Sequence, residues 1–282
     1  MKKTDWLFPS FRETGVFVMR GTPAHLFFLV FMGSEKGSKM PDDLNNFPIA
    51  VPVATQTLHA VGAAWAAKIK GDQIATVTFL GDGATSEGDF HEAMNFAGVM
   101  NTPTLFVCQN NQYAISVPRE KQTASATIAE KAFAYGFKGI QVDGNDVFSV
   151  YVAAKAALEH GYNGKGPAFI EMVTYRRCPH TTSDDPSLYR SEKEEKEWEK
   201  KDPLVRFTAY LRAQKILNEQ VEQKIQQKAE RTVMGAVEKA ESMRVMTEED
   251  IFQYTFRDMP KQLQEQLAYL KQINELKKEA KP

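Results

Sequence analysis

The sequence predicts an α/β fold with a mainly parallel sheet, helices on both faces of it, and a C-terminal helical tail. Strand-like apolar runs alternate with helical segments between residues 74 and 173, which is typical of a parallel sheet covered on both sides. The runs 74–80 and 104–108 flank a helical segment at 87–100, and this order predicts a βαβ unit. After Ser191 the sequence becomes strongly charged and helical in pattern.

The first helices are predicted from their ends. Thr22-Pro23 favours a helix start with Thr22 as N-cap, and that helix ends near Gly33. The polar segment 34–46 is expected to be a surface loop. The alanine-rich segment 55–70 predicts a helix that is closed by Gly71.

The middle of the chain continues the alternation. Ser86 is expected to cap the helix at 87–100, with Asp89 completing a capping box. Further elements are predicted as a helix at 128–135, a strand at 139–142, a helix at 147–160 and a strand at 169–173.

The tail is predicted as helices at 203–211, 220–242 and 261–278, after a charged stretch at 192–201. We therefore divide the chain into an α/β domain at 1–191 and a C-terminal helical extension of the same domain at 192–282.

The composition is that of an ordinary globular protein and points to no nucleic-acid or membrane partner. The 282 residues are 43% apolar and 25% charged, as in ordinary globular proteins, and the net charge of −1 favours neither nucleic acid nor an anionic membrane as a partner. The longest early apolar run, Leu26–Met32, is too short to span a bilayer. Cys108 and Cys178 form no CxxC pair, which fits a reducing compartment: the cytoplasm, or the mitochondrial matrix in a eukaryote.

Two polar motifs follow neighbouring strands of the predicted βαβ unit. Asp82 lies between Gly81 and Gly83 after the first strand, and Asn111 follows the second. Because parallel strands end at the same edge of a sheet, a carboxylate and an amide oxygen are expected to meet there. With the main-chain carbonyl of Tyr113 they suit Mg²⁺ carrying a diphosphate, and the glycines let the backbone approach the phosphates. The following helix start adds free N–H groups.

These residues resemble a known family. The segments 81–90 and 109–116 resemble the thiamine-diphosphate motif of the α subunits of 2-oxo acid dehydrogenase E1 components. The segments 52–56, 175–191 and 201–207 are also similar to that family, so the resemblance covers the chain from about Phe11 onward. It implies the thiamine-diphosphate-binding fold, with 1–191 as the diphosphate-binding domain.

The resemblance implies roles for individual residues. Asp82, Asn111 and Tyr113 are expected to bind Mg²⁺. Arg12 and Arg176 are expected to contact the diphosphate, because the arginine guanidinium can form two parallel hydrogen bonds to a phosphate. The full set of expected cofactor-binding residues is Arg12, Val51, Val53, Gly81, Asp82, Gly83, Ala84, Asn111, Tyr113, Arg176 and His180. In branched-chain members a potassium ion is bound by a loop that corresponds here to Ala50, Pro52, Thr55 and Gln56.

His180 is the predicted catalytic residue. It lies on a polar loop after the last strand, and a neutral imidazole can donate to phosphate or move a proton. The other histidines, His25, His59, His91 and His160, fall in or beside predicted helices and are expected to be structural.

The chain has room for one α/β domain, so the glutamate that activates thiamine diphosphate is expected on another polypeptide. The resemblance implies an α2β2 heterotetramer with an E1 β subunit, and an acyl transfer from a 2-oxo acid to the lipoyl domain of E2. The substrate stays open between pyruvate and a branched-chain 2-oxo acid.

Two other interpretations remain. Family α subunits carry a longer segment before the Phe11-Arg12 position, so we expect an N-terminally shortened form, which allows a truncated, non-catalytic structural or regulatory subunit. Half of a split non-oxidative thiamine enzyme, such as a transketolase, is a third interpretation, and the loop 175–191 speaks against it.

Overall fold

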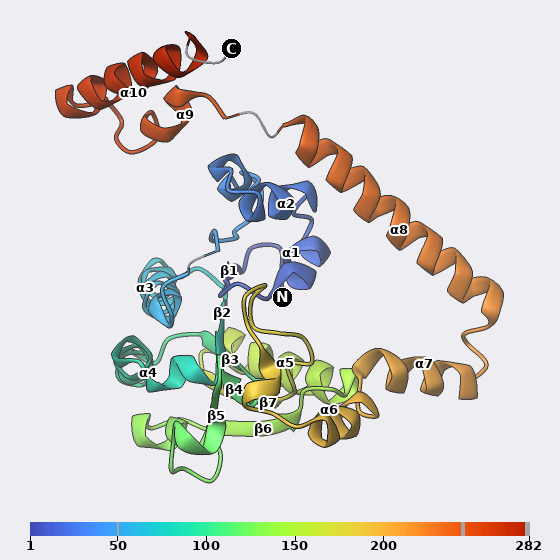
Figure 1. The fold of residues 1–282 in the computed structure, drawn as a ribbon. Coiled ribbons are helices and arrows are strands. Elements are labelled where there is room, and N and C mark those ends of the chain that lie inside the picture. Colours follow the sequence, from blue (N-terminus) through green and yellow to red (C-terminus); the bar gives the residue numbers. More distant parts are fainter. Residues whose placement is uncertain (50, 244–245, 280–282) are drawn as a thin grey trace. The chain divides into compact units, whose positions relative to one another are not determined.

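The computed structural model describes residues 1–49, 51–243 and 246–279, and the chain divides into two compact units (Figure 1). The first unit consists of Met1–Thr22 and Ser38–Glu230, and the second of Pro23–Gly37 and Arg231–Pro282.

A parallel sheet forms the centre of the first unit. Among the described residues its strand order is β1-β2-β3-β7-β6, and every neighbouring pair is parallel. The strands are β1 (Trp6–Phe8), β2 (Thr76–Gly81), β3 (Thr104–Asn110), β6 (Gly139–Asp143) and β7 (Ala168–Val173). The predicted α/β class with a parallel sheet is confirmed. The short edge strand β1 was not predicted, because three residues carry no readable periodicity.

Helices cover both faces of this sheet (Figure 1). Phe106 and Cys108 of β3 point to a core shared with α3, α4 and η4, whereas Leu105 and Val107 point to a core shared with α5. This alternation is the period of two expected for a strand buried on both sides. The covering elements are α3 (Thr55–Lys70), α4 (Gly88–Met100), the 3-10 helix η4 (Ala129–Tyr135) and α5 (Val147–Tyr162).

The predicted capping box of α4 is wrong. Glu87 is the N-cap and makes no side-chain cap bond, while Ser86 ends a short 3-10 helix, η2 (Gly83–Ser86). The carboxylate of Asp89 instead accepts a hydrogen bond from the Thr55 hydroxyl at 2.8 Å. A tertiary contact to the start of α3 therefore replaces the local cap.

The predicted N-cap role of Thr22 is wrong for a similar reason. Its hydroxyl accepts a hydrogen bond from the side-chain amide of Asn46 at 3.0 Å, and α2 (His25–Phe31) begins only at His25. In contrast, the prediction for α3 is confirmed at both ends, and Gly71 closes it in the left-handed conformation with φ of 77°.

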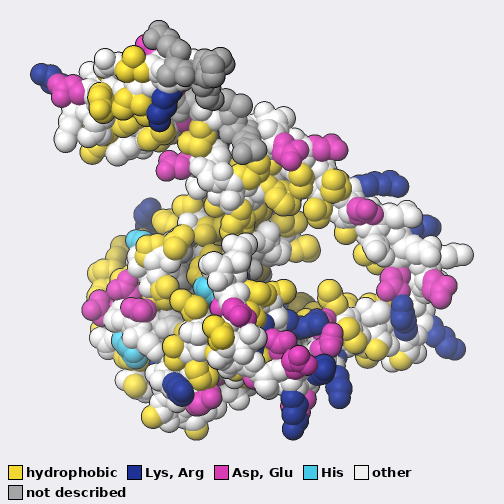
Figure 2. All heavy atoms as spheres, in the orientation of Figure 1, with side chains coloured by type: hydrophobic (Ala, Val, Ile, Leu, Met, Phe, Trp, Pro, Cys, Tyr) yellow, Lys and Arg dark blue, Asp and Glu magenta, His cyan; other side chains and the backbone are white. Residues whose placement is uncertain are grey.

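The C-terminal part is helical, as predicted. Figure 2 shows acidic and basic side chains mixed over α6. Ser191 is the N-cap of this helix, and its side chain accepts a hydrogen bond from the backbone N–H of Glu194. The helices are α6 (Glu192–Glu199), α7 (Pro203–Ala213), α8 (Glu219–Ser242), α9 (Glu248–Phe252) and α10 (Lys261–Glu279). None of the described helices combines the length and apolar character needed to cross a membrane.

Within the second unit, Leu26 and Leu29 of α2 pack against Ala240 near the end of α8. Lys36 forms an ion pair of 2.8 Å with the buried Asp250 of α9. The remaining elements of the chain are α1 (Thr14–Arg20), η1 (Glu35–Ser38), β4 (Tyr113–Ala114), β5 (Val117–Pro118), η3 (Arg119–Lys121) and η5 (Pro186–Leu188).

Candidate functional site

Asp82 and Asn111 meet at the carboxyl edge of the sheet. The register of β2 and β3 pairs Gly81 with Gln109, so each polar residue lies just beyond its strand. Asp82 is 2% exposed, and its carboxylate accepts a hydrogen bond from the backbone N–H of Asn111. The parallel register thus brings together two residues that are far apart in sequence.

The Asp82 carboxylate is buried and forms no ion pair within 4.0 Å with a Lys or Arg of the described part of the chain, although the charge of Arg176 acts on it. Burial raises its pKa, and hydrogen bonds from Gln122 and from backbone N–H groups oppose that rise. The Gln122 amide donates to Asp82 Oδ2 at 2.9 Å. A buried carboxylate with spare lone pairs suits a hard cation, which would compensate its charge.

The other two expected ligand oxygens lie in the turn after β3. Asn111 Oδ1 accepts a bond from the Tyr113 N–H at 3.3 Å, and the Tyr113 carbonyl accepts one from Arg176 Nη1 at 3.2 Å. Each oxygen keeps a second lone pair. The described residues contain no cluster of three or more His, Cys, Asp or Glu side chains suited to a metal. A cation here would therefore be bound by one carboxylate with amide and carbonyl oxygens, which favours Mg²⁺ over a transition metal.

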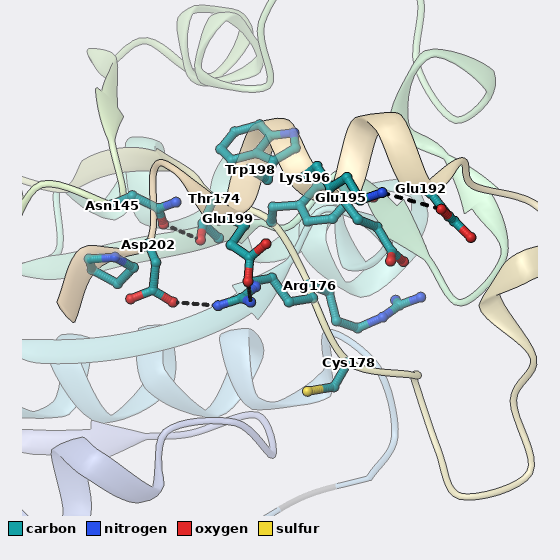
Figure 3. A pocket seen from close by; sticks show the side chains of 13 residues that line it. Asn145, Thr174, Arg176, Cys178, Glu192, Glu195, Lys196, Trp198, Glu199 and Asp202 are labelled. Atoms are coloured by element: carbon teal, nitrogen blue, oxygen red, sulfur yellow. Dashed lines mark hydrogen bonds and ion pairs between the residues drawn. The ribbon is translucent and has the colours of Figure 1, made fainter. Parts of the chain in front are cut away.

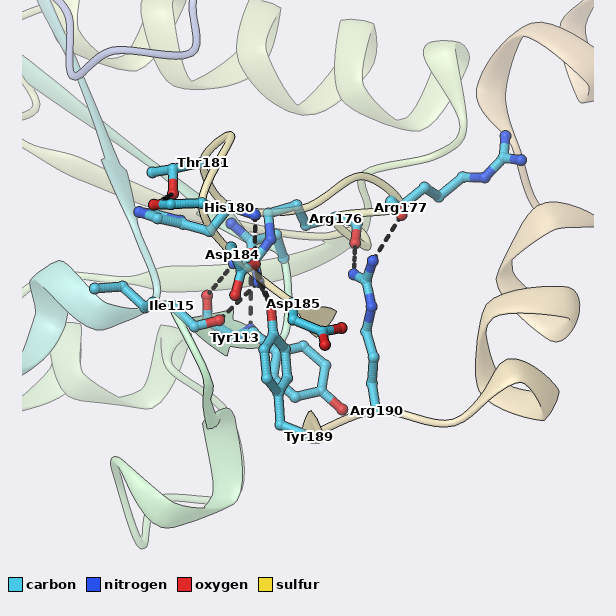
Figure 4. Close-up of polar contacts among 12 residues, drawn as sticks. Tyr113, Ile115, Arg176, Arg177, His180, Thr181, Asp184, Asp185, Tyr189 and Arg190 are labelled. Carbon is cyan, nitrogen blue, oxygen red and sulfur yellow. Dashed lines mark hydrogen bonds and ion pairs between the residues drawn. The ribbon is translucent and has the colours of Figure 1, made fainter. Parts of the chain in front are cut away.

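Arg176, just after β7, connects three segments of the site (Figure 4). Besides Tyr113, its guanidinium donates to the Ile115 carbonyl at 2.6 Å and to the Tyr189 hydroxyl at 2.8 Å. Asp184 lies 4.0 Å from the same guanidinium. Arg176 is 6% exposed, and its Nε is buried without a hydrogen-bond partner among the described residues. One N–H of this cation is thus left for a ligand.

His180 and Arg12 lie against this cluster. Arg12 Nη2 is 3.3 Å from His180 Nδ1, and the backbone N–H of His180 donates to Asp184 at 2.7 Å. Burial, followed by the charges of Arg12 and Arg176, lowers the pKa of His180. Burial and the charge of Arg176 likewise lower the pKa of Arg12. A buried guanidinium, Arg176, and an exposed one, Arg12, that repel each other are the arrangement expected around an anion.

The two glycines beside Asp82 differ in their surroundings. A Cβ at Gly83 would lie 2.7 Å from the Cβ of Ala114, so packing alone requires glycine there. A Cβ at Gly81 would have no atom of the described residues within 4 Å, its chain neighbours aside. The space next to Gly81 is therefore open for a ligand. The next residue, Ala84, is buried in the core.

The segment before α3 exposes apolar side chains. Val51 is 76% and Val53 51% exposed, and Pro52 is also exposed, while Ala50 lies outside the described residues. The Gln56 amide donates to the Phe79 carbonyl at 2.7 Å and leaves its Oε1 buried without a partner in the described part of the chain.

A cavity of about 930 Å³ lies between the chain after β7 and α6 (Figure 3). Arg176 and Cys178 line it, together with Arg177, which forms ion pairs with Glu199 at 2.9 Å and with Asp202 at 2.8 Å. These pairs connect the loop that carries His180 to the start of the helical tail.

Sequence reasoning missed three residues of this network. Asp184 and Tyr189 lie in the loop that carries the family resemblance, but nothing in the sequence indicated that both would bond Arg176. Gln122 lies 40 residues from Asp82, outside any recognised motif, and the sequence held no signal for their contact.

Comparisons with known proteins show which family the sequence matches. The family model described as dehydrogenase E1 component matches residues 1–249. A 3-methyl-2-oxobutanoate dehydrogenase subunit alpha from Mycobacterium tuberculosis is 48% identical over 229 residues, which cover 81% of this chain and 62% of that relative. A pyruvate dehydrogenase E1 component subunit alpha from Staphylococcus aureus is 40% identical over 273 residues, covering 96% of this chain and 74% of the relative. The chain thus spans less than two thirds of the length of the first relative.

Proposed function

Because the chain belongs to the dehydrogenase E1 component family, we propose that it is the α subunit of the E1 component of a 2-oxo acid dehydrogenase complex. In this role it binds thiamine diphosphate and Mg²⁺ and decarboxylates a 2-oxo acid, with acyl transfer to a lipoyl domain. The observation that carries the proposal is the gathering of Arg12, Arg176 and His180 beside the buried Asp82.

The proposed metal ligands are Asp82, Asn111 and the Tyr113 carbonyl. They offer one negative charge and two neutral oxygens, which leaves room in a shell of about six ligands for phosphate oxygens and water. The cation would balance the buried Asp82 carboxylate, whose charge no Lys or Arg of the described residues pairs with. The open space at Gly81 supports close approach of a diphosphate to the backbone.

Arg12 and Arg176 are the proposed diphosphate contacts. Arg176 offers its unpartnered Nε, and Arg12 offers an exposed guanidinium. The backbone at Val51 and Val53 is proposed to face the aminopyrimidine ring. Thiamine diphosphate, when bound, supplies the electron sink needed to cleave the bond between the 2-oxo carbon and its carboxylate.

His180 is the proposed acid–base residue. Since burial and two positive charges lower its pKa, its imidazole is neutral at pH 7 and can accept a proton at one ring nitrogen. The hydrogen bond from its backbone N–H to Asp184 holds the loop in place. The activating glutamate would come from an E1 β subunit in an α2β2 heterotetramer.

Potassium binding by Pro52, Thr55 and Gln56 is a further proposal. The unpartnered Gln56 Oε1 supports it, because a buried acceptor without a donor suits a cation. The Thr55 hydroxyl donates to Asp89 and keeps its lone pairs as acceptors.

The test is reconstitution of the chain with its β subunit. We expect reduction of an artificial electron acceptor that depends on a 2-oxo acid, thiamine diphosphate and Mg²⁺. Comparing kcat/KM for pyruvate and 3-methyl-2-oxobutanoate decides the substrate. Asp82→Ala should abolish Mg²⁺-dependent cofactor binding, whereas the matched exposed variant Asp72→Ala should leave it intact. An assembled complex that binds no thiamine diphosphate would refute the proposal.

A further inference from the structure

We propose that Gln122 is a positioning residue for the metal site, which holds the Asp82 carboxylate in the orientation that binds the cation. The inference rests on the proposed function and adds to it a residue that never touches the cation. Gln122 follows η3, in the segment after the β4-β5 hairpin, and reaches back to the Gly-Asp-Gly turn.

The side-chain amide of Gln122 donates hydrogen bonds to two acceptor oxygens. Its Nε2 donates to Asp82 Oδ2 at 2.9 Å and to the Val117 carbonyl at 3.1 Å. Both acceptors lie on the same side of the amide, so exchanging its oxygen and nitrogen would place Oε1 against a carboxylate and a carbonyl. That arrangement is repulsive, and the donor orientation is therefore fixed by its surroundings.

This contact occupies one oxygen of a buried carboxylate. A donor on Oδ2 restricts rotation of the Asp82 side chain, and the carboxylate keeps lone pairs for a cation beside this bond and the one from the Asn111 N–H. Hydrogen bonds of this kind to a ligating carboxylate orient it, and their loss typically costs about 10–100-fold in metal affinity. Since no Lys or Arg of the described residues pairs with Asp82, Gln122 is the main side chain that constrains it.

The other end of the amide is unused by the protein. Gln122 Oε1 is buried without a hydrogen-bond partner among the described residues, and it lies 3.6 Å from where a Cβ of Gly83 would be. A buried acceptor without a hydrogen bond costs about 1–3 kcal/mol, so packing does not explain why position 122 is a glutamine. The hydrogen bond that its amide donates to Asp82 explains it.

The experiment uses the assembled α–β complex with saturating thiamine diphosphate, and Mg²⁺ affinity is measured by calorimetric titration. Gln122→Met keeps the length of the side chain without the donor, and Gln122→Leu removes the donor with a shorter apolar side chain. We expect Gln122→Met and Gln122→Leu each to weaken Mg²⁺ binding about 10–100-fold. Cofactor affinity at saturating Mg²⁺ should change little in Gln122→Met, because the diphosphate contacts are intact.

Gln141→Met, at an exposed position of β6, is the matched control and should bind Mg²⁺ as the wild type does. A Gln122→Met complex with the Mg²⁺ affinity of this control would overturn the inference. So would an equal loss of cofactor affinity at saturating Mg²⁺, which indicates general damage to the site. If Gln122→Met does not assemble, the Gln122→Leu variant decides by the same comparison. Failure of the wild-type complex to bind thiamine diphosphate would instead reject the proposed function.

Discussion

Alanine at the two glycines beside Asp82 should separate cofactor binding from stability. At Gly83 the new Cβ would lie 2.7 Å from the Cβ of Ala114, whereas ordinary contacts begin at 3.4 Å, so the hairpin must yield by the difference of 0.7 Å. Overpacking of this kind costs about 1–3 kcal/mol. At Gly81 the Cβ meets no atom of the described part of the chain within 4 Å, apart from its neighbours in sequence, and the backbone of Gly81 has no positive φ.

Gly81→Ala should therefore leave stability unchanged or raise it by about 0.4–1 kcal/mol, since alanine restricts the unfolded chain more than glycine does. The same methyl group fills the space that we assign to the diphosphate, so thiamine diphosphate affinity should fall at least tenfold, or about 1.4 kcal/mol. Gly83→Ala should lower the melting temperature by about 2–4 °C per kcal/mol lost.

The assays are thermal unfolding of the chain followed by circular dichroism, and calorimetric titration of the α–β complex with thiamine diphosphate. Equal destabilisation by both variants would refute the packing argument. Unchanged cofactor affinity in Gly81→Ala would show that no phosphate lies beside this backbone.

Three further predictions follow from charge and packing. Arg12→Met should raise the pKa of His180 toward its ordinary value, because the positive charge of Arg12 helps to lower it. NMR titration of the imidazole measures the change, and an unchanged His180 pKa would contradict the contact between Arg12 and His180. Burial raises the pKa of Glu13 above its ordinary 4.5, so its contribution to stability is complete below pH 4.5 and is lost as pH rises through the raised pKa. Glutamine cannot ionise, so Glu13→Gln should lose less of its free energy of unfolding between pH 4.5 and pH 7 than the wild type does, as measured by urea unfolding. An equal pH dependence of that free energy in the variant and the wild type would count against this prediction. Gly98→Ala should destabilise α4 despite better helix propensity, because its Cβ would lie 2.1 Å from the Tyr135 carbonyl oxygen; a higher melting temperature would exclude that clash.

The sequence predicted those elements whose signals are local. Helix α3 has an alanine-rich body and a closing glycine, and both ends agree with the structure. Strands β2, β3 and β7 are mainly apolar and contain few polar residues, such as Thr78 and Glu171, and their parallel order follows from the intervening helices. Asp82 and Asn111 were expected at one edge for the same reason.

Local signals failed where a tertiary partner took the side chain. Asp89 was predicted to cap α4, but the Thr55 hydroxyl engages it. Thr22 was predicted to cap α2, but Asn46 engages it. Gln122 could not be predicted, because its role depends on a contact across 40 residues that no spacing rule encodes.

The same parallel sheet has a consequence for the order of folding events. The carboxyl edge of the sheet, which carries Asp82 and Asn111, forms only when β2 pairs with β3 and β3 pairs with β7. These pairings place Thr76 opposite Thr104 and Leu105 opposite Ala168. Pairings over such separations close late, because the loop entropy is lost before the contacts form. A ligand that recognises only the completed edge does not stabilise the folding transition state. It should therefore slow unfolding while leaving the refolding rate unchanged, so cofactor would prolong the lifetime of the folded chain without helping to create it.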